Sequence, residues 1–288
     1  MIHYSCKNCG AQLDLGQSGS LSCPYCGSKA FLSDKEFRGN KEFRKKLLSY
    51  YKACNDAKEM SYENDTLWEC AGRDTFTTAK GQAVNIEYMK KYSYKDMVCY
   101  LAKETVVYVF SDNKSSERFM QGLNSLTFPE ADTKLYRSFP ELKTIVDLSE
   151  GKAVVFTRRP HFYPLEFFVP MKNKHSAWVI SRMENICCAL EFSELEHKDI
   201  SSSSIFINVE THEGVLFGDW RGVSKKVSNK DLLSIREVGK EISEDTSKPA
   251  EFKEFLNSKP KSSAFDDFSY WDSVIEKGFG GHNFNKYE

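Results

Sequence analysis

The chain has 288 residues, 40% of them apolar and 14% aromatic, which is enough to bury the core of one large domain or two smaller ones. Its formal net charge of −1 excludes a global basic field that would recruit nucleic acid, although local basic clusters stay possible. No apolar run reaches the length of a membrane span, and the N-terminus lacks a signal-peptide core. We therefore expect a cytoplasmic protein with no membrane partner. Nine cysteines, an odd number, argue against a secreted disulfide framework.

Four cysteines near the start of the chain form two C-x2-C pairs, Cys6 with Cys9 and Cys23 with Cys26. Thirteen residues separate the pairs, and a glycine follows each pair, where a small residue lets the backbone double back past a metal. This array resembles a zinc ribbon. The resemblance implies a structural zinc ion, because four thiolate ligands leave no position open for water or substrate. We assign residues 1–32 to the ribbon.

Residues 33–64 are predicted to form a connector helix. Ser33 and Glu36 have the spacing of a capping box, and apolar residues such as Phe43 and Leu47 then recur at helical spacing. Residues 44–46 give the helix a basic face. Two interpretations stay open: a solvated connector, or a ribbon and helix that together contact nucleic acid or an acidic partner.

The pattern changes at residue 67 to short β-prone runs separated by turns. A helix with an apolar stripe is expected from Ser115 to Leu126. Because neighbouring β-prone runs are joined by short turns, they predict an antiparallel sheet within residues 65–170. The expected strands lie at 74–78, 83–89, 97–102, 105–110, 141–148 and 152–157.

Residues 171–288 are predicted to be mainly helical. The clearest helix, at 174–195, has apolar residues every three to four positions. Two apolar strands follow, with a turn expected at Glu213 and Gly214 between them. Further helices are predicted at 231–242, 250–256 and 265–277. The whole pattern indicates an α+β protein in which a β-rich part precedes an α-rich part.

Two short motifs flank the predicted hairpin. His197-Lys198-Asp199 precedes it and Asp219-Trp220-Arg221 follows it. They resemble the His-Arg-Asp and Asp-Phe-Gly motifs of protein kinases, and the long helix before them and the helix after them agree in order and spacing. The resemblance covers about residues 70–280. It implies a bilobal protein-kinase-like fold with a β-rich N-lobe (65–170) and an α-rich C-lobe (171–288), preceded by the zinc ribbon.

The resemblance also implies roles for individual residues. In the family the first Asp accepts the hydroxyl proton of the substrate and the second binds the magnesium of Mg·ATP, which makes Asp199 the catalytic base and Asp219 the metal ligand. Ser204 stands where the family has an Asn that binds a second magnesium. Glu117 corresponds to the helix Glu that pairs with a strand Lys, and Asp231 is expected to tie down the catalytic loop.

Several departures from the family pattern argue against activity. The strand Lys is absent, with Val109 or Phe110 at its position, and only Gly81 stands where a glycine-rich loop should be. Ser201 and Ser204 replace the catalytic-loop Lys and Asn, and a hydroxyl is a weaker magnesium ligand than an amide carbonyl. No Ala-Pro-Glu motif follows Asp-Trp-Arg. Because electrostatic stabilisation supplies most of phosphoryl-transfer catalysis, these losses should raise the barrier considerably.

Three functions remain open. The favoured one is a degenerate kinase or pseudokinase that acts as a nucleotide-binding or scaffolding regulator of a protein partner. The alternative is an active, atypical ATP-dependent phosphotransferase that uses Asp199 and Asp219. A weaker alternative is a zinc-ribbon protein that binds nucleic acid.

Overall fold

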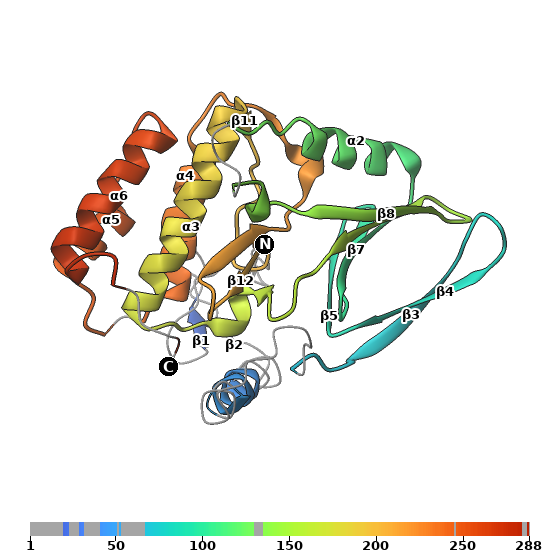
Figure 1. Cartoon of the computed structure of the whole chain (residues 1–288), viewed down its shortest axis with the longest axis horizontal. Helices are drawn as coiled ribbons and strands as arrows, with labels where there is room; N and C mark the ends of the chain where they lie inside the picture. Colours follow the sequence, from blue (N-terminus) through green and yellow to red (C-terminus); the bar gives the residue numbers. More distant parts are fainter. Residues whose placement is uncertain are drawn as a thin grey trace.

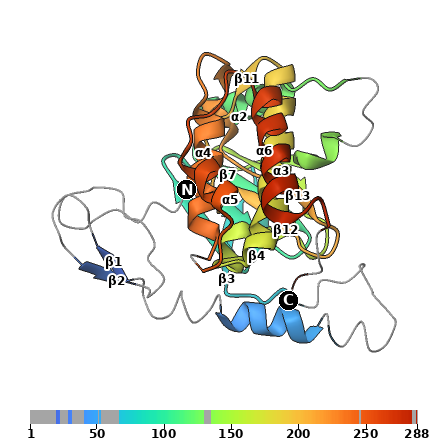
Figure 2. The same ribbon diagram turned by 90° about the vertical axis from the view of Figure 1, so that its left-hand side faces the viewer.

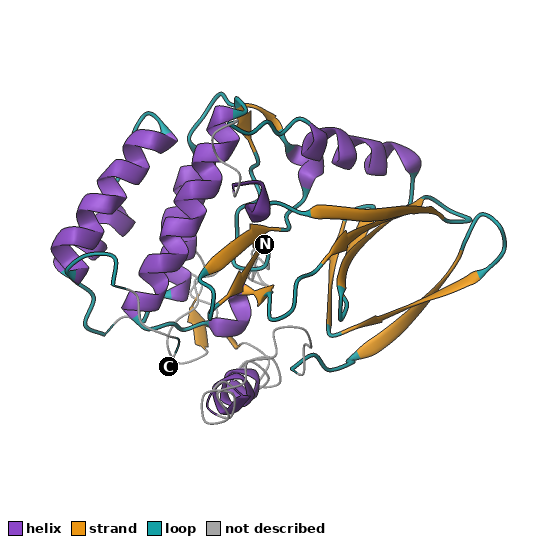
Figure 3. Cartoon of the chain, viewed as in Figure 1, coloured by secondary structure: helices purple, strands orange, loops and turns teal. Residues whose placement is uncertain are grey.

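The computed structural model describes residues 20–22, 29–31, 41–50, 52, 67–129, 135–244, 246–283 and 287. A part rich in strands lies beside a part rich in helices (Figure 1, Figure 3). This mixed α/β architecture is consistent with the expected kinase-like fold. None of the helices in these ranges is long and apolar enough to cross a membrane.

The predicted zinc ligands Cys6, Cys9, Cys23 and Cys26 lie outside the described residues, as do the capping positions of the connector. Two short strands border the second cysteine pair: β1 (Ser20–Ser22) and β2 (Lys29–Phe31) are paired in antiparallel fashion. The zinc ribbon therefore stays a prediction.

Part of the predicted connector, residues 41–50, is helical and packs against the chain that follows the sheet. Leu47 is fully buried. The ring of Phe43 lies edge-on to Tyr163, with centroids 4.8 Å apart, and Arg44 donates a hydrogen bond to the carbonyl of Phe168 at 3.3 Å. This helix therefore has one docked apolar face and one polar face.

The main sheet has five antiparallel strands, ordered β5-β6-β7-β9-β8. Their bounds are β5 (Lys90–Tyr94), β6 (Met97–Leu101), β7 (Thr105–Phe110), β8 (Glu141–Asp147) and β9 (Lys152–Thr157). Helix α2 (Asn113–Asn124) joins β7 to β8 and covers one face. It begins two residues before the prediction, because the Asp112 carboxylate caps it by accepting from the Ser115 amide at 2.7 Å.

A further hairpin of β3 (Gly72–Thr77) and β4 (Ala83–Tyr88) lies over the outer face of this sheet, the face opposite α2. Alternate residues of β7 point to opposite faces, as the period of a strand requires. Tyr108 belongs to the main core, whereas Val107 and Val109 belong to a smaller apolar cluster beneath the hairpin, together with Ile86.

The helical part is built around α3 (Asn173–Phe192), which packs against α4 (Lys230–Ile242) and α6 (Ala264–Phe279), while α5 (Ala250–Asn257) packs on α4 and α6 (Figure 2). A buried ion cluster joins three of these helices. Arg236 contacts Asp267 at 2.5 Å and Glu184 at 3.2 Å. The cluster fixes the relative positions of the helices, because separating the buried guanidinium of Arg236 from the Asp267 carboxylate would leave each charge alone in the core.

The hairpin expected between the two motifs is formed by β12 (Ile205–Asn208) and β13 (Glu213–Leu216). The predicted position of its turn is wrong: Glu213 and Gly214 lie within β13, and the turn is formed by the four residues before them. The side chain of Asn208 sets the turn, because its Oδ1 accepts from the Glu210 amide at 3.0 Å and the Thr211 amide at 3.2 Å.

The remaining elements are short. They are η1 (Leu135–Ser138), β10 (Tyr163–Pro164), η2 (Leu165–Phe168), β11 (Leu195–Glu196), η3 (Trp220–Gly222) and β14 (Ser224–Lys225).

Candidate functional site

The hairpin β12–β13 brings Asp199 and Asp219 together, as the sequence predicted. Asp199 lies in the loop before β12 and Asp219 follows β13. The Asp199 carboxylate accepts a hydrogen bond from the Asp219 amide at 2.8 Å. A glycine is required at position 218, because a Cβ there would lie 2.3 Å from the His197 ring.

Asp231 of α4 anchors the loop that carries Asp199, as the kinase resemblance implied. The two carboxylate oxygens of Asp231 accept from the amides of His197 and Lys198, both at 2.7 Å. The His197 ring is fully buried edge-on to Trp220, and burial lowers its pKa, so the ring is neutral at physiological pH. These contacts make the loop rigid.

Ser204, the predicted second magnesium ligand, uses its hydroxyl within the same loop. Its Oγ donates to the Asp199 carbonyl at 2.7 Å and accepts from the Ser201 amide at 2.8 Å. Both serines are buried. Their observed contacts therefore stabilise the loop conformation.

The guanidinium of Arg221 forms an ion pair with the carboxylate of Asp219. Its Nε lies 2.9 Å from Oδ1 and its Nη2 lies 2.7 Å from Oδ2, which is a bidentate pair. The same guanidinium donates through Nη1 to the carbonyl of Lys95, in the turn between β5 and β6, at 2.7 Å. The hydrogen bond with Asp219 raises the pKa of Arg221. Both carboxylate oxygens of Asp219 are therefore paired with a guanidinium, which a magnesium ion bound to this carboxylate would have to displace or accommodate.

The described residues contain no group of three or more His, Cys, Asp or Glu side chains that could hold a metal ion.

On β7, the strand on which the Lys was expected, Tyr108 and Phe110 both face α2, whereas Val109 faces the β3–β4 hairpin. The hydroxyl of Tyr108 donates to the Phe217 carbonyl at 2.8 Å, two residues before Asp219. Its ring packs against Phe119 of α2, with centroids 4.7 Å apart. Glu117 is exposed on α2. An aromatic pair therefore packs between β7 and α2.

Strand β5 is attached directly to the helical part through Glu166 of η2. The Tyr92 hydroxyl donates to Glu166 Oε1 at 2.6 Å, and Lys90 Nζ lies 2.8 Å from the same oxygen. Burial is the main reason that the pKa of Tyr92 is raised, and the neighbouring Glu166 carboxylate raises it further. These side chains bridge the sheet and the helical part.

The linker that leaves the sheet is tied to the β6–β7 turn by Arg158. This buried side chain donates to the Ala102 carbonyl at 2.9 Å and to the Phe162 carbonyl at 2.9 Å. The backbone amide of Arg158 donates to the Glu104 carbonyl at 2.9 Å. The first amide of the linker is therefore paired with the β6–β7 turn.

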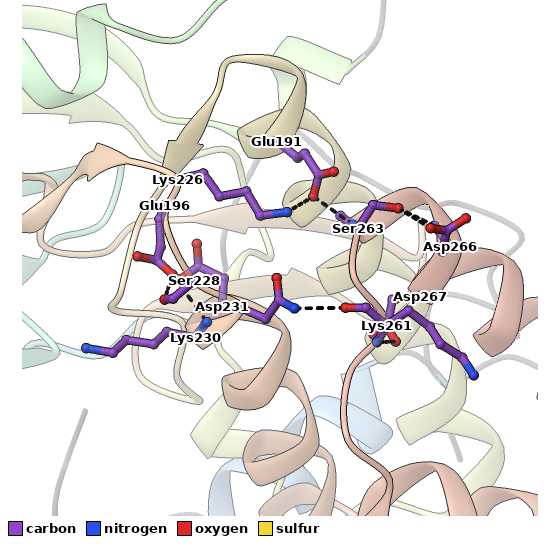
Figure 4. Close-up of polar contacts among 12 residues, drawn as sticks. Glu191, Glu196, Lys226, Ser228, Lys230, Asp231, Lys261, Ser263, Asp266 and Asp267 are labelled. Carbon is purple, nitrogen blue, oxygen red and sulfur yellow. Dashed lines mark hydrogen bonds and ion pairs between the residues drawn. The ribbon is translucent and has the colours of Figure 1, made fainter.

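The segment between the second motif and α4 is short and firmly held (Figure 4). Lys226 pairs with Glu191 at the end of α3, and Ser228 hydrogen-bonds the buried Glu196. Asn229 donates to the Lys261 carbonyl at 2.9 Å. These contacts hold the segment against the end of α3 and the loop that precedes α6.

No family model and no curated protein matches the chain. Among solved structures it is similar to WbdD, described as a bifunctional kinase-methyltransferase, with 12% identity and a TM-score of 0.45 over 69% of this chain and 47% of WbdD. The chain thus spans about half the length of that neighbour.

Two kinase domains are also similar. The ROP18 kinase domain, solved with AMP-PNP and sucrose, has 12% identity and a TM-score of 0.47 over 73% of this chain and 86% of that chain. A rhoptry antigen kinase domain from Toxoplasma gondii has 8% identity and a TM-score of 0.47 over 73% of this chain and 87% of that chain.

Proposed function

We propose that the chain is a kinase-like pseudokinase that acts as a scaffolding regulator of a protein partner and transfers no phosphate. The observation that carries this proposal is the bidentate contact of Arg221 with Asp219, which also reaches Lys95. One side chain both neutralises the carboxylate expected to bind magnesium and fastens the β5–β6 turn over it.

The electrostatics of the site support this proposal. Phosphoryl transfer depends on cations placed around the phosphates. The strand that would supply a Lys, β7, instead presents Tyr108, whose hydroxyl is neutral and already donates to a backbone carbonyl. Arg221 is the nearest described cation to Asp219, and its charge is paired there. Among the described residues, the cation in contact with Asp219 is therefore already neutralised.

The bridging side chains favour scaffolding over nucleotide binding. A nucleotide in the family position would have to displace the contacts of Tyr92 and Lys90 with Glu166, and these contacts are partly or fully buried. Breaking a buried charge-assisted hydrogen bond costs more than breaking an exposed one. The zinc ribbon predicted at Cys6, Cys9, Cys23 and Cys26 would then provide a second, independently folded surface for the partner.

An active phosphotransferase remains the second candidate, because one observation favours it. Asp199 and Asp219 are adjacent, as a base and a metal ligand must be. Activity would require Arg221 to leave Asp219 so that magnesium could bind. The phosphotransferase and the pseudokinase should therefore respond differently to Mg·ATP.

Thermal unfolding of the full chain with millimolar Mg·ATP distinguishes them. The pseudokinase proposal predicts an unchanged melting temperature for the wild type and for Asp219→Ala, no transfer of phosphate, and a protein partner that elutes with the wild type. A magnesium-dependent rise in the wild type that is lost in Asp219→Ala would overturn the proposal in favour of the phosphotransferase.

A further inference from the structure

A cavity of about 210 Å³ lies between the β3–β4 hairpin and the outer face of the main sheet. In Figure 1 the β3–β4 hairpin lies at the end of the molecule that is distant from α3 to α6. The cavity walls are mainly apolar, and the principal apolar side chains come from four strands and from the residue that follows β8. They are Phe76, Val84, Ile86, Val107, Leu148 and Val155.

The hairpin is fastened to the sheet at its tip. Hydrogen bonds join its turn to the β8–β9 turn, from the Ala79 amide to the Asp147 carbonyl at 2.9 Å and from the Ser149 amide to the Thr77 carbonyl at 2.8 Å. An isolated bridge between Thr78 and Leu148 lies between them. The tip is therefore closed.

The other end of the hairpin is fastened by side chains. The Asp74 carboxylate accepts from Lys91 at 2.6 Å and from the Tyr100 hydroxyl at 2.8 Å. The rings of Phe76 and Tyr88 both pack against Tyr100, with centroids 6.0 Å and 5.4 Å away. Because both ends are held, the hairpin cannot collapse onto the sheet between them. The cavity is thus a consequence of the fold.

An apolar cavity of this size is unfavourable when empty, because its walls lack the contacts that close packing would supply. Water gains little there, since an ordered water needs two to four polar partners. Apolar cavities of about 150 Å³ in other proteins bind benzene. The volume here exceeds that, and Thr105, Asn85 and Glu87 add polar groups to the wall, where the Glu87 carboxylate pairs with Arg73 of β3.

We propose that this cavity is a binding site for a compact, uncharged molecule of one or two aromatic rings. A single polar substituent is compatible with the wall, whereas a charged group is disfavoured, because a mainly apolar wall returns little of the hydration that the group would lose. The site lies on the opposite face of the sheet from Tyr108 and Asp219. It is therefore independent of the function proposed above.

Indole is a suitable probe, with tryptophan as its charged analogue. The full chain is titrated with each compound, and thermal unfolding and the methyl NMR signals of valine and isoleucine are recorded. Indole should raise the melting temperature in proportion to its occupancy and shift the signals of Ile86, Val107 and Val155. The signal of Val238, buried in α4, should not move. Tryptophan should have neither effect.

Two matched variants locate the site. Ala153→Leu fills the cavity from β9 and should weaken indole binding about tenfold or more. Ala83→Leu places the same side chain on an exposed position of β4 that does not line the cavity, and should leave binding unchanged.

The proposal is overturned if saturating indole neither stabilises the wild type nor shifts the three lining methyl signals. It is equally overturned if Ala153→Leu binds indole as tightly as the wild type. Should Ala153→Leu fail to fold, the methyl shifts in the wild type decide the matter without it.

Discussion

Arg221 binds both carboxylate oxygens of Asp219, from two residues further along the chain. In a kinase the corresponding motif ends in glycine, which has no side chain to compete for the metal ligand. Here the motif supplies its own cation. Because Arg221 also reaches the Lys95 carbonyl, the same contact links the helical part to the sheet.

Replacing Arg221 with glycine should expose the Asp219 carboxylate. We expect Arg221→Gly to lower the free energy of unfolding by about 1–3 kcal/mol, since charge-assisted hydrogen bonds are lost. We also expect magnesium alone to raise the melting temperature of this variant and not that of the wild type, because Asp219 and Asp199 would then be adjacent without a competing guanidinium.

Arg137→Gly is the matched control, because Arg137 also lies in a short 3-10 helix and pairs with a carboxylate, that of Glu213. Its response to magnesium should equal that of the wild type. Equal magnesium stabilisation in all three proteins would show that Arg221 does not shield Asp219.

The hydroxyl of Tyr108 should contribute to stability in a way that its ring alone does not. Tyr108→Phe leaves the buried Phe217 carbonyl without this donor, and we expect a loss of about 1–2 kcal/mol in urea unfolding. Tyr136→Phe, at a tyrosine that is 57% exposed, should change stability by less than about 0.5 kcal/mol. Equal effects of the two substitutions would contradict the role given to this hydrogen bond.

The adjacency of the two aspartates was predictable, because motif spacing and strand pattern determine where a hairpin returns the chain. The anchoring role of Asp231 was implied by the kinase resemblance. The sequence alone did not show which residues of β7 face the helix. A shift of one position along β7 moves a side chain to the other face, so the register of the sheet separates Tyr108 and Phe110, which face α2, from Val109.

Strand β5 was missed for a related reason. Lysines at positions 90 and 91 and a serine at 93 hide the alternation, and only Tyr92 is buried. The hydroxyl of Tyr92 finds its hydrogen-bond partner in Glu166, which lies 74 residues away in sequence. The Arg221 contact was within reach of sequence reasoning, since a cation two residues after a carboxylate can fold back onto it. The cavity could not be predicted from the sequence, because it depends on how the β3–β4 hairpin meets the β8–β9 hairpin.

The zinc prediction can be tested independently of the fold. We expect metal analysis of the purified chain to find one zinc ion per chain, released by chelators and absent in a Cys6→Ser, Cys9→Ser variant. Cys70→Ser changes an exposed free thiol and should leave the zinc content unchanged. Equal zinc content in both variants would exclude the ribbon as the binding site.

The buried cluster of Arg236, Asp267 and Glu184 should make stability depend on pH. Burial raises the pKa of Glu184 well above its usual value, and Asp267 raises it further while Arg236 lowers it. The native state therefore holds a proton that the unfolded state releases above the usual carboxyl range. This contribution to stability is fully present at acidic pH, below the unfolded pKa, and is lost as the pH rises through the folded pKa.

Glu184→Gln keeps the shape of the side chain and removes its titration. We expect its free energy of unfolding, measured with urea between about pH 5 and pH 8, to increase relative to the wild type as the pH rises. Glu237 lies on the exposed side of α4. The free energy of unfolding of Glu237→Gln should therefore change with pH in parallel with that of the wild type. If the Glu184→Gln curve also ran parallel, Glu184 would have to be ionised in the native state, and the cluster would carry two carboxylates for a single buried guanidinium.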